Sequence, residues 1–193
     1  MKTYIAKLKS KAPYSQGRHY SKTTVPELEK EGKDAYETRT WRNRMHVKNG
    51  EVYIPPMAFK NCLAEAAKFL SIQIPGKGKA TYTKHFEAGV MVVDEVMLGI
   101  RADDVQGERL FVPSNGRRGD GTRVERVFPL IPEWEADVTI HIIDETITED
   151  VLARHLREAG MLIGVGRFRP RNNGFYGRFT LVSLDEEMEE AAE

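Results

Sequence analysis

Residues 137–160, DVTIHIIDETITEDVLARHLREAG, contain the pattern that decides the fold. Apolar and polar residues alternate through Asp137–Ile143, which is typical of a strand with one buried face. Thr146 followed by Glu149 is a capping-box pattern, and Gly160 is expected to end the helix that begins there. Apolar side chains recur between these limits at helical spacing, which predicts a buried face formed by Val151, Leu152, His155, Leu156 and Ala159.

The rest of the chain contains elements that match this pair. Pro55-Pro56 starts a predicted helix over residues 57–70, because proline is tolerated in a first helical turn. Strands are predicted at residues 3–9, Thr40–Val47, Val52–Ile54, Gly89–Ile100 and Tyr176–Leu184. The order strand, helix, strands, helix, strand predicts an α+β protein with a ferredoxin-like antiparallel sheet and two helices on one face.

Two polar segments interrupt this order, at residues 10–34 and 101–128. Both are rich in turn-forming residues, and we interpret them as excursions from one domain that spans residues 1–184. Residues 185–193 carry six acids and no base, and we expect a disordered acidic tail there.

The net charge of zero conceals an asymmetry between the body and this tail. Residues 1–184 carry 29 basic and 23 acidic residues, which favours an anionic partner, although a solubilising tail beside an ordinary surface explains the same counts. A single cysteine, Cys62, and the lack of a signal peptide or an apolar membrane-spanning run are compatible with a cytoplasmic protein that contacts no membrane.

The most informative segment is Gly164–Phe179, GVGRFRPRNNGFYGRF, which holds four arginines, four glycines, four aromatic residues and no acid. Glycines let a backbone approach phosphates, arginines pair with phosphate oxygens, and aromatic faces stack on unpaired bases. The alternative is a tight turn with core aromatics and solvated arginines. We therefore predict a nucleic-acid site formed by Gly164, Gly166, Arg167, Arg169, Arg171, Asn172, Tyr176 and Arg178.

Other basic residues extend this candidate site, or belong to solvated faces. Arg39, Arg42 and Arg44 surround Trp41, an aromatic residue that is able to stack on a base. Arg117 and Arg118 lie in the second excursion, and Lys60 lies on the first helix.

No motif for metal or covalent chemistry is present. The five histidines show no HxH or HxxxH spacing, and one cysteine cannot complete a zinc site. Gly76–Thr81 lacks the glycine spacing of a phosphate-binding Walker loop. We expect no catalytic residues, no metal and no cofactor.

Two motifs resemble the RAMP superfamily, in particular the backbone subunits that bind guide RNA in multi-subunit CRISPR effector complexes. One is the glycine-rich loop Gly164–Pro170 after the second predicted helix. The other is Val52–Pro55 leading into helix 57–70, in which Phe59 and Lys60 match the apolar and basic positions.

The resemblance implies an RRM-like core with an inserted hairpin, or thumb, at 101–128. It also implies a non-catalytic subunit that binds the backbone of single-stranded RNA independently of sequence, with copies of itself or other effector subunits as partners. Some relatives cut RNA with an acid in the region of Asp34 and Glu37, to which we assign no catalysis.

Two alternatives stay open. One is a metal-independent endoribonuclease that uses His19, Tyr20 or Tyr36. The other is a single-stranded DNA-binding protein.

Overall fold

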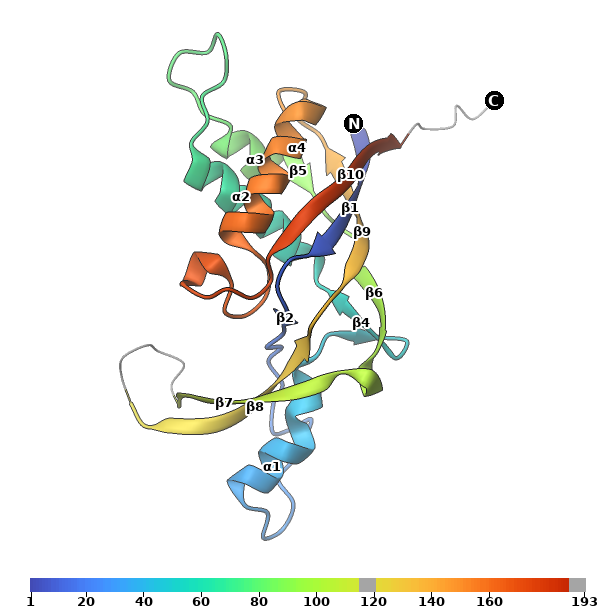
Figure 1. Ribbon diagram of the computed structural model, residues 1–193, viewed down its shortest axis with the longest axis vertical. Helices are drawn as coiled ribbons and strands as arrows, with labels where there is room; N and C mark the ends of the chain where they lie inside the picture. The colour runs from blue at the N-terminus through green and yellow to red at the C-terminus, as the bar shows by residue number, and fades with distance from the viewer. Residues whose placement is uncertain (115–120, 188–193) are drawn as a thin grey trace.

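Four antiparallel strands form the main sheet of the computed structural model, in the spatial order β10 (Phe179–Glu187), β1 (Lys2–Ser10), β9 (Glu135–Ile142) and β5 (Val90–Met91) (Figure 1). The structure describes residues 1–114 and 121–187. Helix α2 (Pro56–Leu70) connects β1 to β5, and α4 (Glu149–Glu158) connects β9 to β10. This is the strand order and connectivity of a ferredoxin-like fold, so the predicted α+β class is confirmed.

The core lies between this sheet and its helices, which gather on one side of it in Figure 1. Strand β1 alternates as expected, with Tyr4, Ala6 and Leu8 buried. The ring of Phe59 on α2 packs edge to face against Phe179 of β10, with 5.8 Å between centroids. Burial of such large side chains stabilises the layer by about 2 kcal/mol each.

A long hairpin extends from the sheet and forms the lower part of the molecule in Figure 1. Its strands are β7 (Gln106–Pro113) and β8 (Arg123–Ile131), and β2 (Tyr14–Ser15) pairs with the base of β8. The hairpin expected within residues 101–128 is therefore present. Arg117 and Arg118 lie outside the described residues.

The strand expected at residues 89–100 is divided in two. Helix α3 (Thr83–Gly89) ends where β5 begins, and β6 (Val96–Arg101) then leaves the main sheet to pair with β4 (Glu51–Ile54), which also pairs with β3 (Val47–Lys48). The acids at 94 and 95 explain the break, because the chain turns there toward solvent and Glu95 pairs with Lys48 at 3.0 Å.

The strand expected at Thr40–Val47 is wrong. Helix α1 (Lys33–Thr40) and a 3₁₀ turn (Trp41–Arg44) occupy most of this segment. The residues that α1 buries are Glu37 and Thr40, which are polar. Hydrophobic periodicity could not detect a helix whose inner face consists of hydrogen-bonding side chains.

Both expected ends of α4 are also wrong. The helix begins after Thr148, because the amide of Thr146 donates to the Asp144 carboxylate at 2.9 Å and closes a separate turn. At Gly160 the chain continues in a π-helical turn, and Gly164, with φ of 71°, ends it. Gly160 instead permits close packing, since a Cβ there would lie 2.2 Å from the carbonyl oxygen of Phe179.

The acidic end of the chain begins inside β10 and not after it. Asp185, Glu186 and Glu187 pair with the first residues of β1, and Lys2 forms an ion pair with Glu186 at 2.9 Å. Residues 188–193 lie outside the described part of the chain, so the disordered tail remains a prediction for them. The acids at 185–187 lie at the end of β10 farthest from the glycine-rich loop (Figure 1).

His155 is a buried histidine on the inner face of α4. Its ring is 1% exposed, and its Nδ1 donates to the carbonyl of Val151 at 2.7 Å, while Nε2 has no partner among the described residues. Burial lowers the pKa of His155, because a protonated ring would place a charge and an unpaired N–H in the core.

When the pKa of a histidine is lower in the folded protein than in the unfolded chain, the folded state loses stability as the pH falls below the pKa of the unfolded chain, which is about 6.5. The free energy of unfolding of the wild type, measured with urea, should be lower at pH 5.5 than at pH 7.5. His155→Phe should remove much of that difference, whereas the control His19→Phe, at an exposed position, should retain it. Equal pH dependence in all three proteins would contradict this role of His155.

Candidate nucleic-acid interface

The loop between residues 164 and 178 is fixed by its own backbone. The amide of Arg167 donates to Ser15, and that of Gly177 donates to Pro13, so the loop is attached to the segment that contains β2. A Cβ at Gly177 would lie 1.8 Å from the carbonyl oxygen of Val165, and one at Gly174 would lie 1.8 Å from that of Phe168. Glycine is needed here for close packing between backbone segments, which is a different role from the phosphate contact expected from the sequence.

Arg167 and Arg44 form a stack with aromatic rings between the loop and the hairpin. The guanidinium carbon of Arg167 lies 3.1 Å from the ring centroid of Phe128 and 4.6 Å from that of Phe168. Arg44 lies 5.1 Å from the same Phe128 ring. We call Arg44, Phe128, Arg167 and Phe168 the arginine stack. Its cation–π contacts join residues from three separate parts of the sequence.

The arginine stack has an excess of positive charge at Arg167. Burial lowers the pKa of Arg167 to about 10, and the nearby charge of Arg44 contributes to this shift, whereas the charge of Glu108 opposes it. Ser15 Oγ accepts from Arg167 Nη1 at 3.4 Å, but no described carboxylate forms an ion pair with it. A partly buried cation next to another cation is costly unless an anion compensates for it.

Glu65 is a carboxylate partner for two of the loop arginines, although the loop segment itself contains no acid. This residue of α2 accepts from Arg169 Nη2 at 2.9 Å and lies 3.8 Å from Arg171 Nε. Arg169 is largely buried and also donates to the carbonyl of Gly164, so its role is structural. The side chain of Arg171 is more than half exposed and can still reach an anion.

Tyr176 was expected to bind nucleic acid, but its ring is buried. Its hydroxyl donates to Glu108 on β7 at 2.7 Å, and this hydrogen bond joins the loop to the hairpin. Burial is the main cause that raises the pKa of Tyr176 to about 12, and the neighbouring Glu108 carboxylate adds to the effect. Arg178 donates to the carbonyls of Met161 and Phe175. The exposed aromatic side chain of this loop is Phe175, which is 57% exposed and packs at its edge on Tyr176.

The remaining predicted cations that the structure describes are dispersed. Arg39 makes a bidentate pair with Glu31, and Arg42 stacks on Trp41 at 4.4 Å. Lys60 donates to the carbonyl of Glu87 at 2.8 Å, on the side of α2 that faces α3. Among these cations, Arg44 lies beside the loop arginines, whereas Arg39 lies on α1 and Arg42 just after it. Asn172 is exposed in the loop itself.

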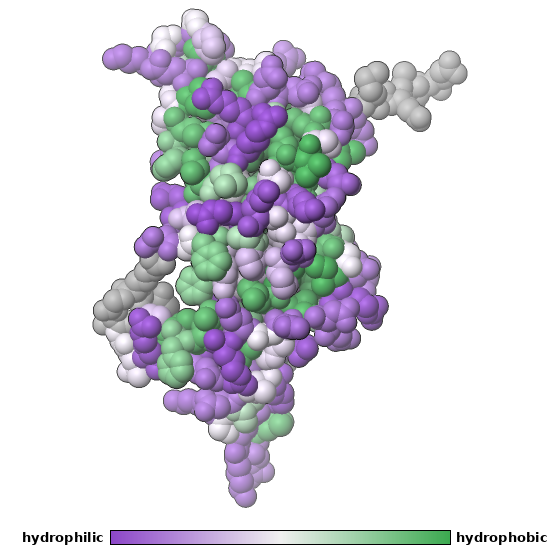
Figure 2. Space-filling model, in the orientation of Figure 1, coloured by the Kyte–Doolittle hydropathy of each residue, from purple (hydrophilic) through white to green (hydrophobic). Residues whose placement is uncertain are grey.

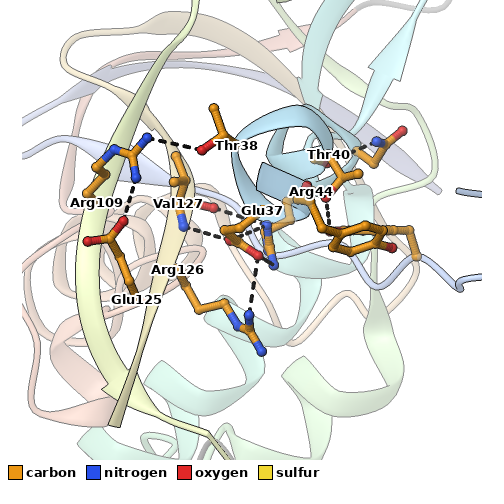
Figure 3. Close-up of polar contacts among 11 residues, drawn as sticks. Glu37, Thr38, Thr40, Arg44, Arg109, Glu125, Arg126 and Val127 are labelled. Atoms are coloured by element: carbon orange, nitrogen blue, oxygen red, sulfur yellow. Dashed lines mark hydrogen bonds and ion pairs between the residues drawn. The ribbon is translucent and has the colours of Figure 1, made fainter. Parts of the chain in front are cut away.

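Glu37 holds the hairpin and α1 together (Figure 3). Its Oε1 accepts from Arg44 Nη1 at 2.8 Å and from the amide of Val127 at 2.7 Å, and its Oε2 accepts from Arg44 Nη2 at 3.0 Å. Arg126 approaches Oε2 to 3.5 Å. With a side chain 4% exposed and both oxygens occupied, Glu37 is a structural anchor and is not free to act on a ligand.

The residues considered for an endoribonuclease, His19, Tyr20 and Tyr36, line one cavity beside this anchor. The hydroxyl of Tyr36 donates to the carbonyl of Val25 at 2.9 Å, and that of Tyr20 lies 2.9 Å from Thr40 Oγ1. Both hydroxyls are therefore committed to the protein. Within residues 1–114 and 121–187, no helix is long and apolar enough to cross a membrane, and no three potential ligands gather as a metal centre.

Sequence reasoning missed Phe128, Phe175, Glu65 and Glu108. Phe175 had a local signal, because it lies between two glycines of a basic loop. Glu65 and Glu108 come from α2 and β7, and only the folded chain brings them to the loop.

Comparison with known structures supports the fold. The chain aligns with Type III-B Cmr-beta bound to cognate target RNA, with a TM-score of 0.55 and 11% identity over 96% of this chain and 60% of that one. It spans only about 60% of the length of that solved chain. Cmr6 from Pyrococcus furiosus aligns with a TM-score of 0.49 and 15% identity over 94% of this chain and 98% of that one. A chain of a CRISPR RNA-guided surveillance complex aligns with a TM-score of 0.45 and 9% identity over 98% of this chain and 72% of that one.

No protein-family model and no curated protein matches the chain by sequence. The structural likeness to Cmr-beta, at 11% identity, shows a shared α+β fold.

Glu37→Gln should destabilise the protein by about 3 kcal/mol, because removing the carboxylate leaves the largely buried Arg44 guanidinium without its counter-charge. Urea unfolding measures the loss. The control Glu125→Gln removes a more exposed pair with Arg109 on the same hairpin and should cost about 1 kcal/mol or less. Similar losses in both variants would show that Glu37 is not the anchor.

Proposed function

We propose that this RAMP-like chain is a non-catalytic subunit of a CRISPR-type ribonucleoprotein that binds the backbone of a single RNA strand. Its partners would be guide RNA and other effector subunits, or further copies of itself. The structural likeness to Cmr-beta, a protein solved with its target RNA, supports this class of function.

The observation that carries the proposal is that Arg167 is partly buried beside Arg44, with the charge of Glu108 nearby but no described carboxylate within ion-pair distance. This guanidinium is held in place by Phe128 and Phe168, beside Arg44, without a described carboxylate in ion-pair contact. A phosphate beside it would supply the missing negative charge, and arginine pairs well with phosphate oxygens. Arg171 extends the positive surface along the loop.

Phe175 adds a contact of a different kind. Its exposed ring lies in the same loop as Arg167 and Arg171, and every base has a face that can stack on an aromatic ring. Backbone pairing and stacking both act without reading base edges, which fits binding that is independent of sequence.

Changing Arg167 and Arg171 together to Gln should weaken RNA binding and reduce the slope of log affinity against log salt by about 1.4. Each phosphate contact on a single strand contributes about 0.7 to that slope. Filter binding at several salt concentrations measures it, with urea unfolding to verify that the variant is folded. The control is a double variant with Arg154→Gln and Arg157→Gln. It removes two charges from the exposed face of α4 and should leave the slope unchanged.

An unaltered slope in the Arg167 and Arg171 variant would place the RNA elsewhere. The same assay with DNA of identical sequence as competitor tests the single-stranded DNA alternative. The cavity that groups His19, Tyr20 and Tyr36 is the observation that favours an endoribonuclease, and RNA that stays full length in the presence of EDTA would exclude it.

Phe175→Ala should weaken RNA binding by about 1–3 kcal/mol, the value of one base stacked on an aromatic ring, and should not change the salt slope. Phe69, which is 61% exposed at the end of α2, provides a matched control in Phe69→Ala. Fluorescence anisotropy with labelled RNA measures both. If the two variants lose affinity equally, Phe175 is not a stacking residue.

A further inference from the structure

We propose that the cavity beside Glu37 is a phosphate-binding pocket. It measures about 380 Å³ and is lined by residues from the first excursion, α1 with the 3₁₀ turn that follows it, and the hairpin, including Arg18, His19, Lys22, Arg44 and Arg126. Two tyrosines, Tyr20 and Tyr36, form further parts of its wall. A cavity of this size is at the lower end of the range for small-molecule sites, which suits a phosphate group or one nucleotide.

The only acid among the described residues of the lining is Glu37, which pairs with two of the pocket cations, Arg44 and Arg126. Glu37 is bound by both outer nitrogens of Arg44 and by the amide of Val127, so its charge is already compensated. Arg126 lies 3.5 Å from it, at the edge of the network and partly exposed (Figure 3). One carboxylate cannot balance both Arg44 and Arg126, and Arg18 forms no ion pair among the described residues, so the pocket keeps an excess of positive charge.

Lys22, another cation of the cavity, has an acidic partner outside the cavity lining. It pairs with Glu27 at 2.5 Å, but both side chains are more than half exposed, and such pairs exchange readily. Figure 2 shows that the lower end of the molecule, where α1 lies in Figure 1, is mostly hydrophilic. The described lining of the pocket consists mostly of polar and charged side chains, which an anion meets on entering.

The pocket is continuous with the arginine stack. Gly17 lines it, and a Cβ at Gly17 would lie 2.8 Å from Cδ of Arg167. Arg44 belongs to both, since it contacts Phe128 on one side and the ring of Tyr20, at 5.4 Å, on the other. Several cations that converge from separate segments favour a ligand with more than one negative charge, and guanidinium groups match the oxygens of phosphate.

Phosphate in this pocket has three possible sources: the free ion, the end of an RNA strand or an internal phosphodiester. Only the RNA sources rest on the proposed function. The pocket itself is tested by inorganic phosphate, so it can be confirmed even if RNA does not bind.

The experiment is a titration of the full chain, followed by NMR of backbone amides, with inorganic phosphate. It is repeated with two RNA oligonucleotides of one sequence that end in a 5′-phosphate or a 5′-hydroxyl. Arg18→Gln removes an exposed pocket cation, and the matched control Arg42→Gln removes an exposed arginine that stacks on Trp41 and does not line the pocket. Urea unfolding verifies that both variants are folded.

We expect phosphate to shift the amides of residues 17–20 in a saturable way. Arg18→Gln should weaken binding about tenfold, the usual effect of losing one charged hydrogen bond, while Arg42→Gln should not. A tenfold preference for the 5′-phosphorylated RNA that is lost in Arg18→Gln identifies a strand end. Equal binding of both RNAs, weakened in Arg18→Gln, identifies an internal phosphate.

The inference is overturned if neither phosphate nor either RNA shifts residues 17–20, or if Arg42→Gln weakens binding as much as Arg18→Gln. Phosphate binding at the pocket without any RNA binding would leave the pocket in place and would contradict the proposed function instead.

Discussion

A single buried carboxylate, that of Glu37, determines how the lower half of the molecule is held. Taking a charge out of water costs several kcal/mol, and Arg44 together with the amide of Val127 offsets that cost. These contacts connect α1, the 3₁₀ turn and β8. Because the position of Arg44 depends on Glu37, so do the arginine stack and one wall of the phosphate pocket.

The glycine-rich loop shows how a sequence motif can be located correctly while its chemistry is misread. Its arginines and glycines do gather where the loop meets the hairpin. However, the glycines serve backbone packing, Arg169 is neutralised by Glu65, and Tyr176 is buried against Glu108. Arg167 and Arg171 remain as the loop cations best placed for an anion, and the exposed aromatic ring is Phe175.

Alternation and helical spacing predicted the central sheet and its two helices, because apolar burial dominates there. They failed where polar groups decide the structure. Helix α1 buries Glu37 and Thr40, and the turn before α4 is closed by the carboxylate of Asp144. The partners Glu65, Glu108 and Phe128 lie at least 36 residues from the loop in sequence, so no local pattern could place them beside it. The same limit applied to the phosphate pocket, whose lining comes from three segments.

The acids at the end of β10 have a consequence for how a ligand arrives. Strand β10 begins at the arginine-rich loop and ends in Asp185–Glu187, and nine extended residues separate these ends by roughly 25 Å. The two ends of β10 therefore differ in the sign of their acidic and basic residues, with Glu186 paired to Lys2. A polyanion that diffuses toward the molecule is repelled at one end and attracted at the other, so most encounters begin with the loop already facing the ligand. The capture rate, and not only the affinity, should then fall as salt shortens the range of the field.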